Sequence, residues 1–148
     1  MKREILFRGK LSHNNKWLIG NLVFSQEGTP YIIPSGIIEQ DGHHLKIFDD
    51  NAYWVNNDTI GQYIGLKDKN GTKIFEGDII KDVSDGVVFT VFYADGGFAI
   101  ESNPVHFGYG YQGNSNPRAS LSDMQTGSYV EGNCVVIGNI HDNKELLK

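Results

Sequence analysis

The chain of 148 residues has little of several residue types, and each shortage excludes a class of protein. Its one cysteine, Cys134, cannot form a disulfide within the chain, and the usual zinc sites built on several cysteines are excluded as well. No apolar run approaches the roughly 18 residues of a membrane-spanning helix. The first residues mix charged with apolar side chains, unlike a signal peptide. We therefore expect a soluble protein of a reducing compartment, the cytoplasm, with no membrane partner.

Positive charge is also in short supply. The chain has 13 Lys and Arg against 18 Asp and Glu, which gives a net charge of −5. An acidic protein does not attract the phosphate backbone nonspecifically, although a local basic patch is compatible with this balance. Nucleic acid is therefore a less favoured partner, but not an excluded one.

Glycine, in contrast, is abundant. The 18 glycines come with only four prolines, which indicates turns within ordered structure rather than a disordered linker. Short runs of β-branched and aromatic residues between turn residues predict many short strands and one domain, residues 1–148. The expected strands are 5–11, 17–24, 31–33, 45–48, 53–55, 60–66, 73–75, 79–83, 87–93, 98–100 and 135–140.

Turn signals in the second half predict how its strands connect. Asp-Gly pairs at Asp85-Gly86 and Asp95-Gly96 separate β-rich runs, which predicts two hairpins and a three-stranded meander. The run 87–93, VVFTVFY, lacks alternation, so we expect a strand that is apolar on both faces. A Gly-Asp pair just before this region is similar to the entry of SH3-like small barrels. The predicted fold is all-β, barrel-like, with an SH3-like meander and one or two short helices.

Closely spaced glycines between 59 and 80 raise the question of a ligand-holding loop. Residues 68–71, Asp-Lys-Asn-Gly, predict a tight turn because Asn and Gly tolerate the left-handed conformation. Gly61 and Gly65 predict bulges or bends in a neighbouring strand. We interpret these glycines as making turns and bends, not as holding an anion.

Helix is expected at two places only. Residues 120–125 could form one or two turns capped by Ser120, with Gly127 ending the helix quickly. Residues 142–147 could form a short terminal helix. Residues 103–117 show no clear pattern and are interpreted as a long surface loop.

The segment 108–113, GYGYQG, matches the letters of a dinucleotide-binding motif. Such a motif must follow a strand and open a helix, whereas Gly113 is followed by Asn-Ser-Asn-Pro, so no cofactor is expected. The favoured interpretation is an unconstrained loop without a binding role. The alternative, preferred to cofactor binding, is a loop that presents Tyr109, Tyr111 and Arg118 as contact residues.

Other reactive side chains give no recognisable site. His43 and His44 beside Asp41 match no established set of metal ligands, so no metal is expected. Cys134 begins an apolar run, which favours a small buried hydrophobe over a nucleophile. Since no acid, base and nucleophile set emerges, the sequence does not predict an enzyme.

Several segments together resemble the YopX family of phage and prophage proteins over nearly the full chain. These are FRGK at 7–10, KW at 16–17, TIGQYIGLKDKNG at 59–71, IFEGDII at 74–80 and VIGNI at 136–140. The end departs from the family pattern, because His141-Asp142-Asn143-Lys144 stands where the family tends to have Tyr-Glu-Asn-Pro. The resemblance implies a mostly β fold and a bacterial cytoplasm that carries a phage. It implies no reaction and no catalytic residues.

Two functional hypotheses follow from the sequence. The first is a noncatalytic phage accessory protein that binds another protein, or itself, through an exposed strand edge or the tyrosine-bearing loop. The second is a nucleic-acid-binding small barrel that uses aromatic and basic side chains. An enzyme ranks third.

Overall fold

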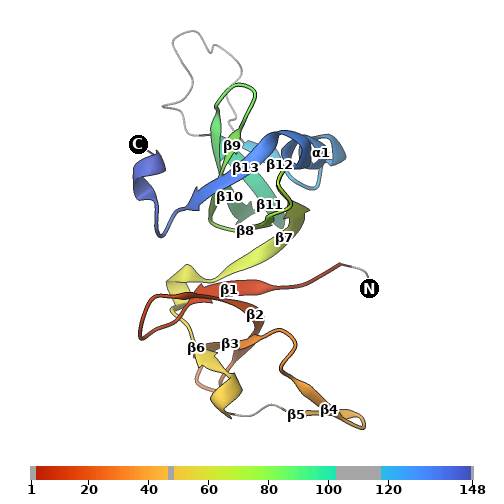
Figure 1. Cartoon of the computed structure of the whole chain (residues 1–148), viewed down its shortest axis with the longest axis vertical. Helices are drawn as coiled ribbons and strands as arrows, with labels where there is room; N and C mark the ends of the chain where they lie inside the picture. The colour runs from red at the N-terminus through yellow and green to blue at the C-terminus, as the bar shows by residue number, and fades with distance from the viewer. Residues whose placement is uncertain (1–2, 47–48, 103–117, 148) are drawn as a thin grey trace. The chain divides into compact units, whose positions relative to one another are not determined.

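The computed structural model describes residues 3–46, 49–102 and 118–147. The chain separates into two compact units, Met1–Tyr63 and Ile64–Lys148. Each unit is built mainly from antiparallel strands, so the all-β prediction is confirmed (Figure 1). The prediction of a single domain stays a prediction.

The first unit is an antiparallel sheet. Its strands are β1 (Phe7–Lys10), β2 (Trp17–Phe24), β3 (Pro30–Pro34), β6 (Tyr53–Trp54) and the start of β7 (Gly61–Lys67), in the order β6-β3-β2-β1-β7. Tight turns connect the first strands, and Asn15 and Gly28 in these turns have φ values of 59° and 84°. Two short 3-10 helices, η1 (Asp49–Asn51) and η2 (Asn57–Thr59), flank β6.

The core of the first unit leaves little room for a side chain at Gly9. Ile32 and Val55 are fully buried. A Cβ added at Gly9 would lie 3.0 Å from Val55 Cβ and 3.3 Å from Ile32 Cδ1. Gly9 therefore lets β1 pack directly against these two side chains.

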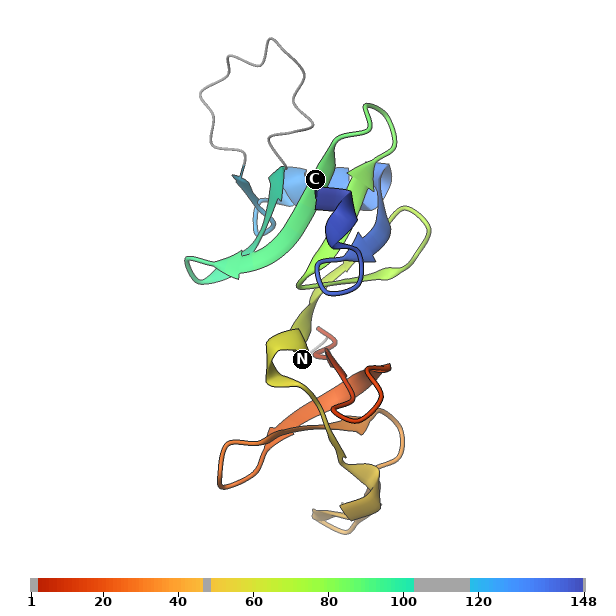
Figure 2. The ribbon, with the colours of Figure 1, turned by 90° about the vertical axis from the view of Figure 1, so that its left-hand side faces the viewer.

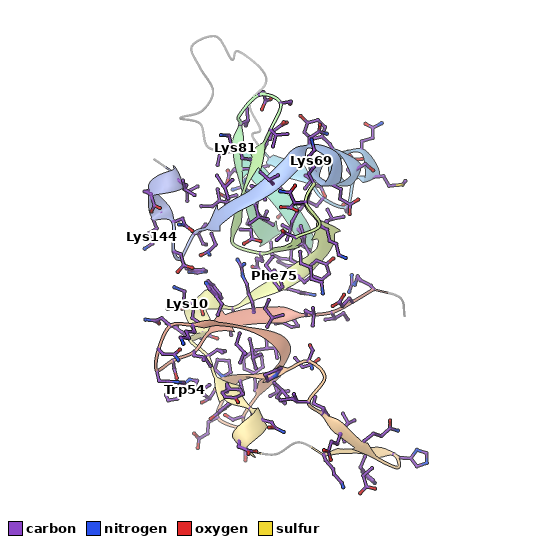
Figure 3. The ribbon with its side chains drawn as sticks, in the orientation of Figure 1. Lys10, Trp54, Lys69, Phe75, Lys81 and Lys144 are labelled. Carbon is purple, nitrogen blue, oxygen red and sulfur yellow. The ribbon has the colours of Figure 1, made fainter. Side chains whose placement is uncertain are left out.

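A separate hairpin belongs to the same unit. Its strands β4 (Glu39–Asp41) and β5 (His44–Lys46) pair only with each other among the described strands, and all six residues are exposed. Figure 3 shows their side chains pointing outward.

The second unit contains a five-stranded antiparallel sheet. Its order is β12 (Arg118–Ser120), β11 (Gly97–Ser102), β10 (Val88–Ala94), β9 (Asp78–Asp82) and β13 (Cys134–Asn139). Strands β9, β10 and β11 are neighbours in sequence and in the sheet, so the predicted meander is confirmed. Figure 2 shows the β10–β11 hairpin extending beyond the rest of this sheet. The end of β7, the short strand β8 (Lys73–Phe75) and the 3-10 helix η4 (Lys144–Leu147) complete the unit.

One helix, α1 (Met124–Asn133), packs on this sheet. Its Val130 is fully buried in the core cluster, which also contains Ile74, Ile80, Val91, Ile100 and Cys134. Strand β10 buries Val88 and Val91 on opposite faces, because residues three apart on a strand point in opposite directions. The prediction that this strand is apolar on both faces is confirmed for these two positions.

The predicted helix at 120–125 was placed too early, and its predicted end at Gly127 is wrong. Ser120 lies in β12, and the helix begins after Asp123, whose side chain accepts a hydrogen bond from Gln125 N at 3.0 Å. Gly127 is a buried residue within the helix. Packing of Val130 into the core outweighs the poor helix propensity of glycine, which costs about 1 kcal/mol.

The all-β class is confirmed, but the expected barrel is not found in the part of the chain that the structure describes. Among the described residues the sheets are open and no closed barrel forms. The likeness to SH3 barrels stays a prediction.

Candidate binding site

A hollow on the five-stranded sheet is the candidate binding site. It has a volume of about 390 Å³ and is lined by residues of β10, β11, β12 and the β10–β11 turn. The lining includes Phe92, Phe98, Ala99, Arg118, Ser120 and Ser122. The Phe92 ring, the serine hydroxyl groups and one guanidinium thus share a single concave surface.

The strand register explains why these side chains meet. Phe92 lies opposite Ala99, and Ala99 lies opposite Ser120. Residues directly opposite each other share a face of a sheet, so all three point to the same side. Arg118, two residues before Ser120, points to that side as well, because strand side chains alternate. This face is the opposite of the one on which Val91 and Ile100 enter the core.

The Arg118 side chain is held by two contacts. Its guanidinium carbon lies 5.0 Å from the centroid of the Phe92 ring, and its Nε donates to Glu101 Oε1 at 3.2 Å. Glu101 lies opposite Arg118 in the register, which places the two groups side by side. About half of the Arg118 side chain, 49%, is exposed. Arg118 is therefore oriented by the sheet but accessible to a ligand.

A tight turn and a pair of serines bound the hollow. Asp95 and Gly96, at the β10–β11 turn, have φ values of 53° and 81°, as the predicted Asp-Gly hairpin requires. Next to Ser120, Ser122 donates its backbone N–H to Ser120 Oγ at 3.3 Å, and the two hydroxyl oxygens are 2.7 Å apart.

The hollow lies beside an edge strand. Among the described residues, β12 pairs with β11 alone. Leu121 N donates to Phe98 O at 2.9 Å, so Leu121 and Phe98 form a hydrogen-bonded pair. Because hydrogen-bonded and non-hydrogen-bonded pairs alternate along an antiparallel ladder, the backbone N–H and C=O groups of Arg118 and Ser120 point away from β11. The Ser120 carbonyl already accepts a hydrogen bond from Asp123 N at 3.3 Å.

One of the three predicted contact residues reaches this site. Arg118 lines the hollow, whereas Tyr109 and Tyr111 lie outside the described residues. Phe92 and Glu101 were not predicted. The signal for Phe92 was its place in the run VVFTVFY, where an aromatic residue on the face away from the core needs a partner.

Comparison with known proteins identifies the family. A family model described as YopX protein matches residues 6–148. The chain belongs to the YopX family. Its fold is similar to the crystal structure of protein EF1440 from Enterococcus faecalis, with a TM-score of 0.59 and 24% sequence identity. The match covers 99% of this chain and 100% of the EF1440 chain, which shows a shared fold. No curated protein matches the chain.

The glycine-rich segment of this YopX-family chain contains a cluster of converging amides. Asp68 Oδ1 accepts hydrogen bonds from Asn70 N at 2.9 Å and Thr72 N at 2.8 Å, and Asp68 Oδ2 accepts one from Val136 N at 2.9 Å. Gly71, with φ of 83°, completes the turn by donating to Asp68 O. The predicted tight turn is confirmed, and the anion that these amides hold is a side chain of the chain itself.

The predicted bends have different outcomes. Gly65 has a φ of 88°, the left-handed conformation typical of a bulge glycine. Gly61 is buried and lies opposite Arg8 of β1 in an ordinary antiparallel pair. A backbone special to glycine is therefore found at Gly65 and not at Gly61.

A second buried carboxylate joins α1 to β9. Asp82 accepts hydrogen bonds from the Tyr129 hydroxyl and, at 2.6 Å, from the Ser84 hydroxyl. Burial would raise the pKa of Asp82, but these bonds and those from the backbone of Ser84 and Asp85 together hold it below its ordinary value. The hydrogen bond to Asp82 raises the pKa of Tyr129.

Cys134 is fully buried, as the sequence predicted. Burial, followed by the negative charges of Asp82 and Asp85, raises the pKa of its thiol to about 12. The thiol is therefore protonated at neutral pH and packs as an apolar side chain.

Among the described residues, no three His, Cys, Asp or Glu side chains are placed to share a metal ion. In the same part of the chain, no helix is both long and apolar enough to cross a membrane.

Proposed function

We propose that this YopX-family chain is a noncatalytic accessory protein of a phage or prophage, acting in the bacterial cytoplasm, that binds another protein chain. The observation that carries the proposal is the hollow at Arg118 beside the edge strand β12. The partner is either a different protein or a second copy of the chain.

Edge strands bind extended segments by a known physical route. An added segment forms main-chain hydrogen bonds with the edge strand, which supply affinity, and places alternate side chains into neighbouring pockets, which supply specificity. A volume of about 390 Å³ lies within the usual range for binding pockets, roughly 300–1,000 Å³. The hollow and the edge strand thus support the same kind of partner.

Site-specific photo-crosslinking tests the proposal. A photoreactive phenylalanine analogue at Ser122, an exposed residue that lines the hollow, is expected to give a protein adduct in host cells carrying the phage. The matched control is the analogue at Met124, which is 85% exposed but does not line the hollow. Adducts of equal yield at both positions, or none at Ser122, would contradict the proposal.

Self-association is tested separately. If the partner is a second copy, light scattering of the purified chain shows a mass that rises above the monomer with concentration. The Ser122 adduct then has twice the mass of the chain. A strict monomer at high concentration removes the second copy as partner and leaves a different protein.

A second candidate function, nucleic-acid binding, is favoured by one feature of the first unit. The Trp17 ring centroid lies 4.7 Å from the Arg8 guanidinium carbon and 5.4 Å from Lys10 Nζ. Residues 5–26 carry Arg8, Lys10 and Lys16 and no Asp or Glu, although the chain as a whole is acidic. A ring among cations is the combination that proteins use to bind single strands.

Oligonucleotide titration tests this candidate. Nucleic-acid binding requires micromolar or tighter affinity for single- or double-stranded oligonucleotides at low salt, and affinity that falls as salt rises. The double variant Arg8→Gln/Lys10→Gln must then weaken binding more than the control variant Lys81→Gln, since exposed Lys81 lies on β9 (Figure 3). Absence of binding at micromolar concentration eliminates the candidate.

A further inference from the structure

We infer that the hollow beside β12 recognises an extended protein segment that carries a carboxylate side chain two residues from a large apolar side chain. The inference rests on the proposed function, because it names the kind of segment that the edge strand receives.

Arg118 presents donors to the site. A guanidinium has five N–H donors in a rigid plane. Among the described residues, only Glu101 is hydrogen-bonded to it, through Nε. The Phe92 ring under the guanidinium holds its plane, which reduces the entropy that a ligand must remove. A planar, half-exposed fork of this kind matches a carboxylate with two parallel hydrogen bonds.

The spacing of the segment follows from β12. Arg118 and Ser120 lie on the same face of the strand, two residues apart. In an added strand, the side chains of one face are also two residues apart, about 7 Å. A carboxylate opposite Arg118 therefore places the next side chain of that face opposite Ser120.

The position opposite Ser120 favours an apolar side chain. Ser120 lies opposite Ala99 of β11, and Ala99 lies opposite Phe92 of β10, so the Ala99 methyl group and the Phe92 ring face the same hollow. A Leu or Phe side chain there would cover apolar surface worth about 25 cal/mol per Å² removed from water. Asp95 also lines the hollow, so a second carboxylate near the β10–β11 turn would be repelled.

Labelled peptides test the inference with the full chain. The first probe is a blocked, fluorescein-labelled peptide of eight threonine-rich residues with Leu and Asp two positions apart in its centre. The second replaces the Asp by Asn, and the third replaces the Leu by Thr. Fluorescence anisotropy at about 0.15 M salt, where the remaining acidic charges are screened beyond about 8 Å, measures the three affinities.

The first peptide is expected to bind at least tenfold more tightly than the second, as befits a charge-assisted hydrogen bond. Arg118→Gln should abolish this difference, and Arg118→Lys, which keeps the charge but not the fork, should restore part of it. Lys81→Gln, which also removes one positive charge from the sheet, should leave the difference unchanged. The third peptide should bind more weakly than the first to every variant.

Three results would overturn the inference: equal binding of the Asp and Asn peptides, a preference that survives Arg118→Gln, or an equal effect of Lys81→Gln. If the Ser122 adduct forms but no carboxylate preference is found, the inference fails while the proposed function stands. If the Ser122 adduct does not form, the proposed function itself fails. Circular dichroism of each variant shows that it remains folded.

Discussion

At the scale of single residues, buried aspartates stabilise the second unit. Asp68, Asp78 and Asp82 are all 5% exposed or less, and each accepts at least one backbone N–H. A carboxylate is costly to bury unless such donors surround it. Part of the acidic excess of the chain is therefore structural, and it holds turns and strands together rather than facing solvent.

Asp68→Asn should destabilise the protein by about 1–3 kcal/mol. The asparagine keeps one acceptor for Asn70 N and Thr72 N, but its NH₂ group faces Val136 N–H, so two donors meet. Urea unfolding measures the loss. Asp85→Asn is the control, because exposed Asp85 Oδ1 accepts a hydrogen bond from Val87 N, which asparagine can also accept. Equal losses in the two variants would contradict the role given to Asp68.

Tyr129→Phe should make the free energy of unfolding depend less on pH in the acidic range. The pKa of Asp82 lies below its ordinary value of 3.8, so Asp82 stabilises the fold above pH 3.8 and loses this contribution as pH falls through its lower folded value. Without the Tyr129 hydroxyl, that pKa rises toward its ordinary value. We expect a loss of about 1 kcal/mol at pH 7 that shrinks below pH 3.8.

Urea unfolding at several pH values between 2 and 7 checks the Tyr129 prediction. Tyr93→Phe, at a residue 56% exposed on β10, is the control and should not alter the pH dependence. A difference between wild type and Tyr129→Phe that stays constant down to pH 2 would show that Asp82 does not respond to this hydroxyl.

At the scale of secondary structure elements, α1 shows how packing overrides local preference. The helix contains Gly127 and Gly132, two poor helix formers, yet it spans ten residues because Val130 fills the core. A Cβ at Gly127 would lie 3.7 Å from Leu121 O and 3.8 Å from Leu66 Cδ1, which is ordinary van der Waals contact. The glycine is thus not required by lack of space.

Gly127→Ala should stabilise the protein by about 0.5–1 kcal/mol, because alanine is the better helix former and its methyl group fits. Gly132→Ala, where no atom lies within 4 Å of the added Cβ, should give a similar gain. Gly65→Ala is the contrast, since φ of 88° strains any side chain there. Thermal unfolding ranks the three variants, and a loss of stability in Gly127→Ala would refute the fit.

At the scale of the whole molecule, each compact unit buries apolar side chains of its own. Ile32 and Val55 are fully buried in the first unit, and Ile80 and Val91 are buried in the second. Two separate cores are what independently stable domains possess. The two cores raise the question of whether the two units also unfold separately.

Matched core variants answer this question. Ile32→Val and Ile80→Val remove one methylene from fully buried sites, at a cost of about 0.5–1.5 kcal/mol each. If the units unfold separately, hydrogen exchange rises mainly in Met1–Tyr63 for the first variant and in Ile64–Lys148 for the second. Equal rises in both units for either variant would establish one cooperative domain, as the sequence predicted.

Local patterns in the sequence predicted the strands well. Residues 17–24 and 73–75 were predicted with the bounds that β2 and β8 have, because alternation and turn residues bound both runs. The β12 strand and the length of α1 could not be predicted, since both depend on partners distant in sequence: β12 on β11, and α1 on the core around Ile80 and Val91.

The candidate site was predicted in part only. Arg118 was singled out as a residue on a loop, but the contacts that make it a site come from Phe92 and Glu101, on two other strands. Side chains 17 and 26 residues away are brought together by register, which no local motif encodes.

The Asp68 turn also closes one side of the five-stranded sheet. Val136 N donates to Asp68 Oδ2, and Cys134 O accepts from Lys69 N at 2.9 Å, so outward backbone groups of β13 are already occupied. Fibre growth by strand pairing between the edges of successive sheets needs two open edges in each sheet, and this sheet has at most one. Any assembly through the opposite border would therefore end at a pair instead of continuing into a polymer.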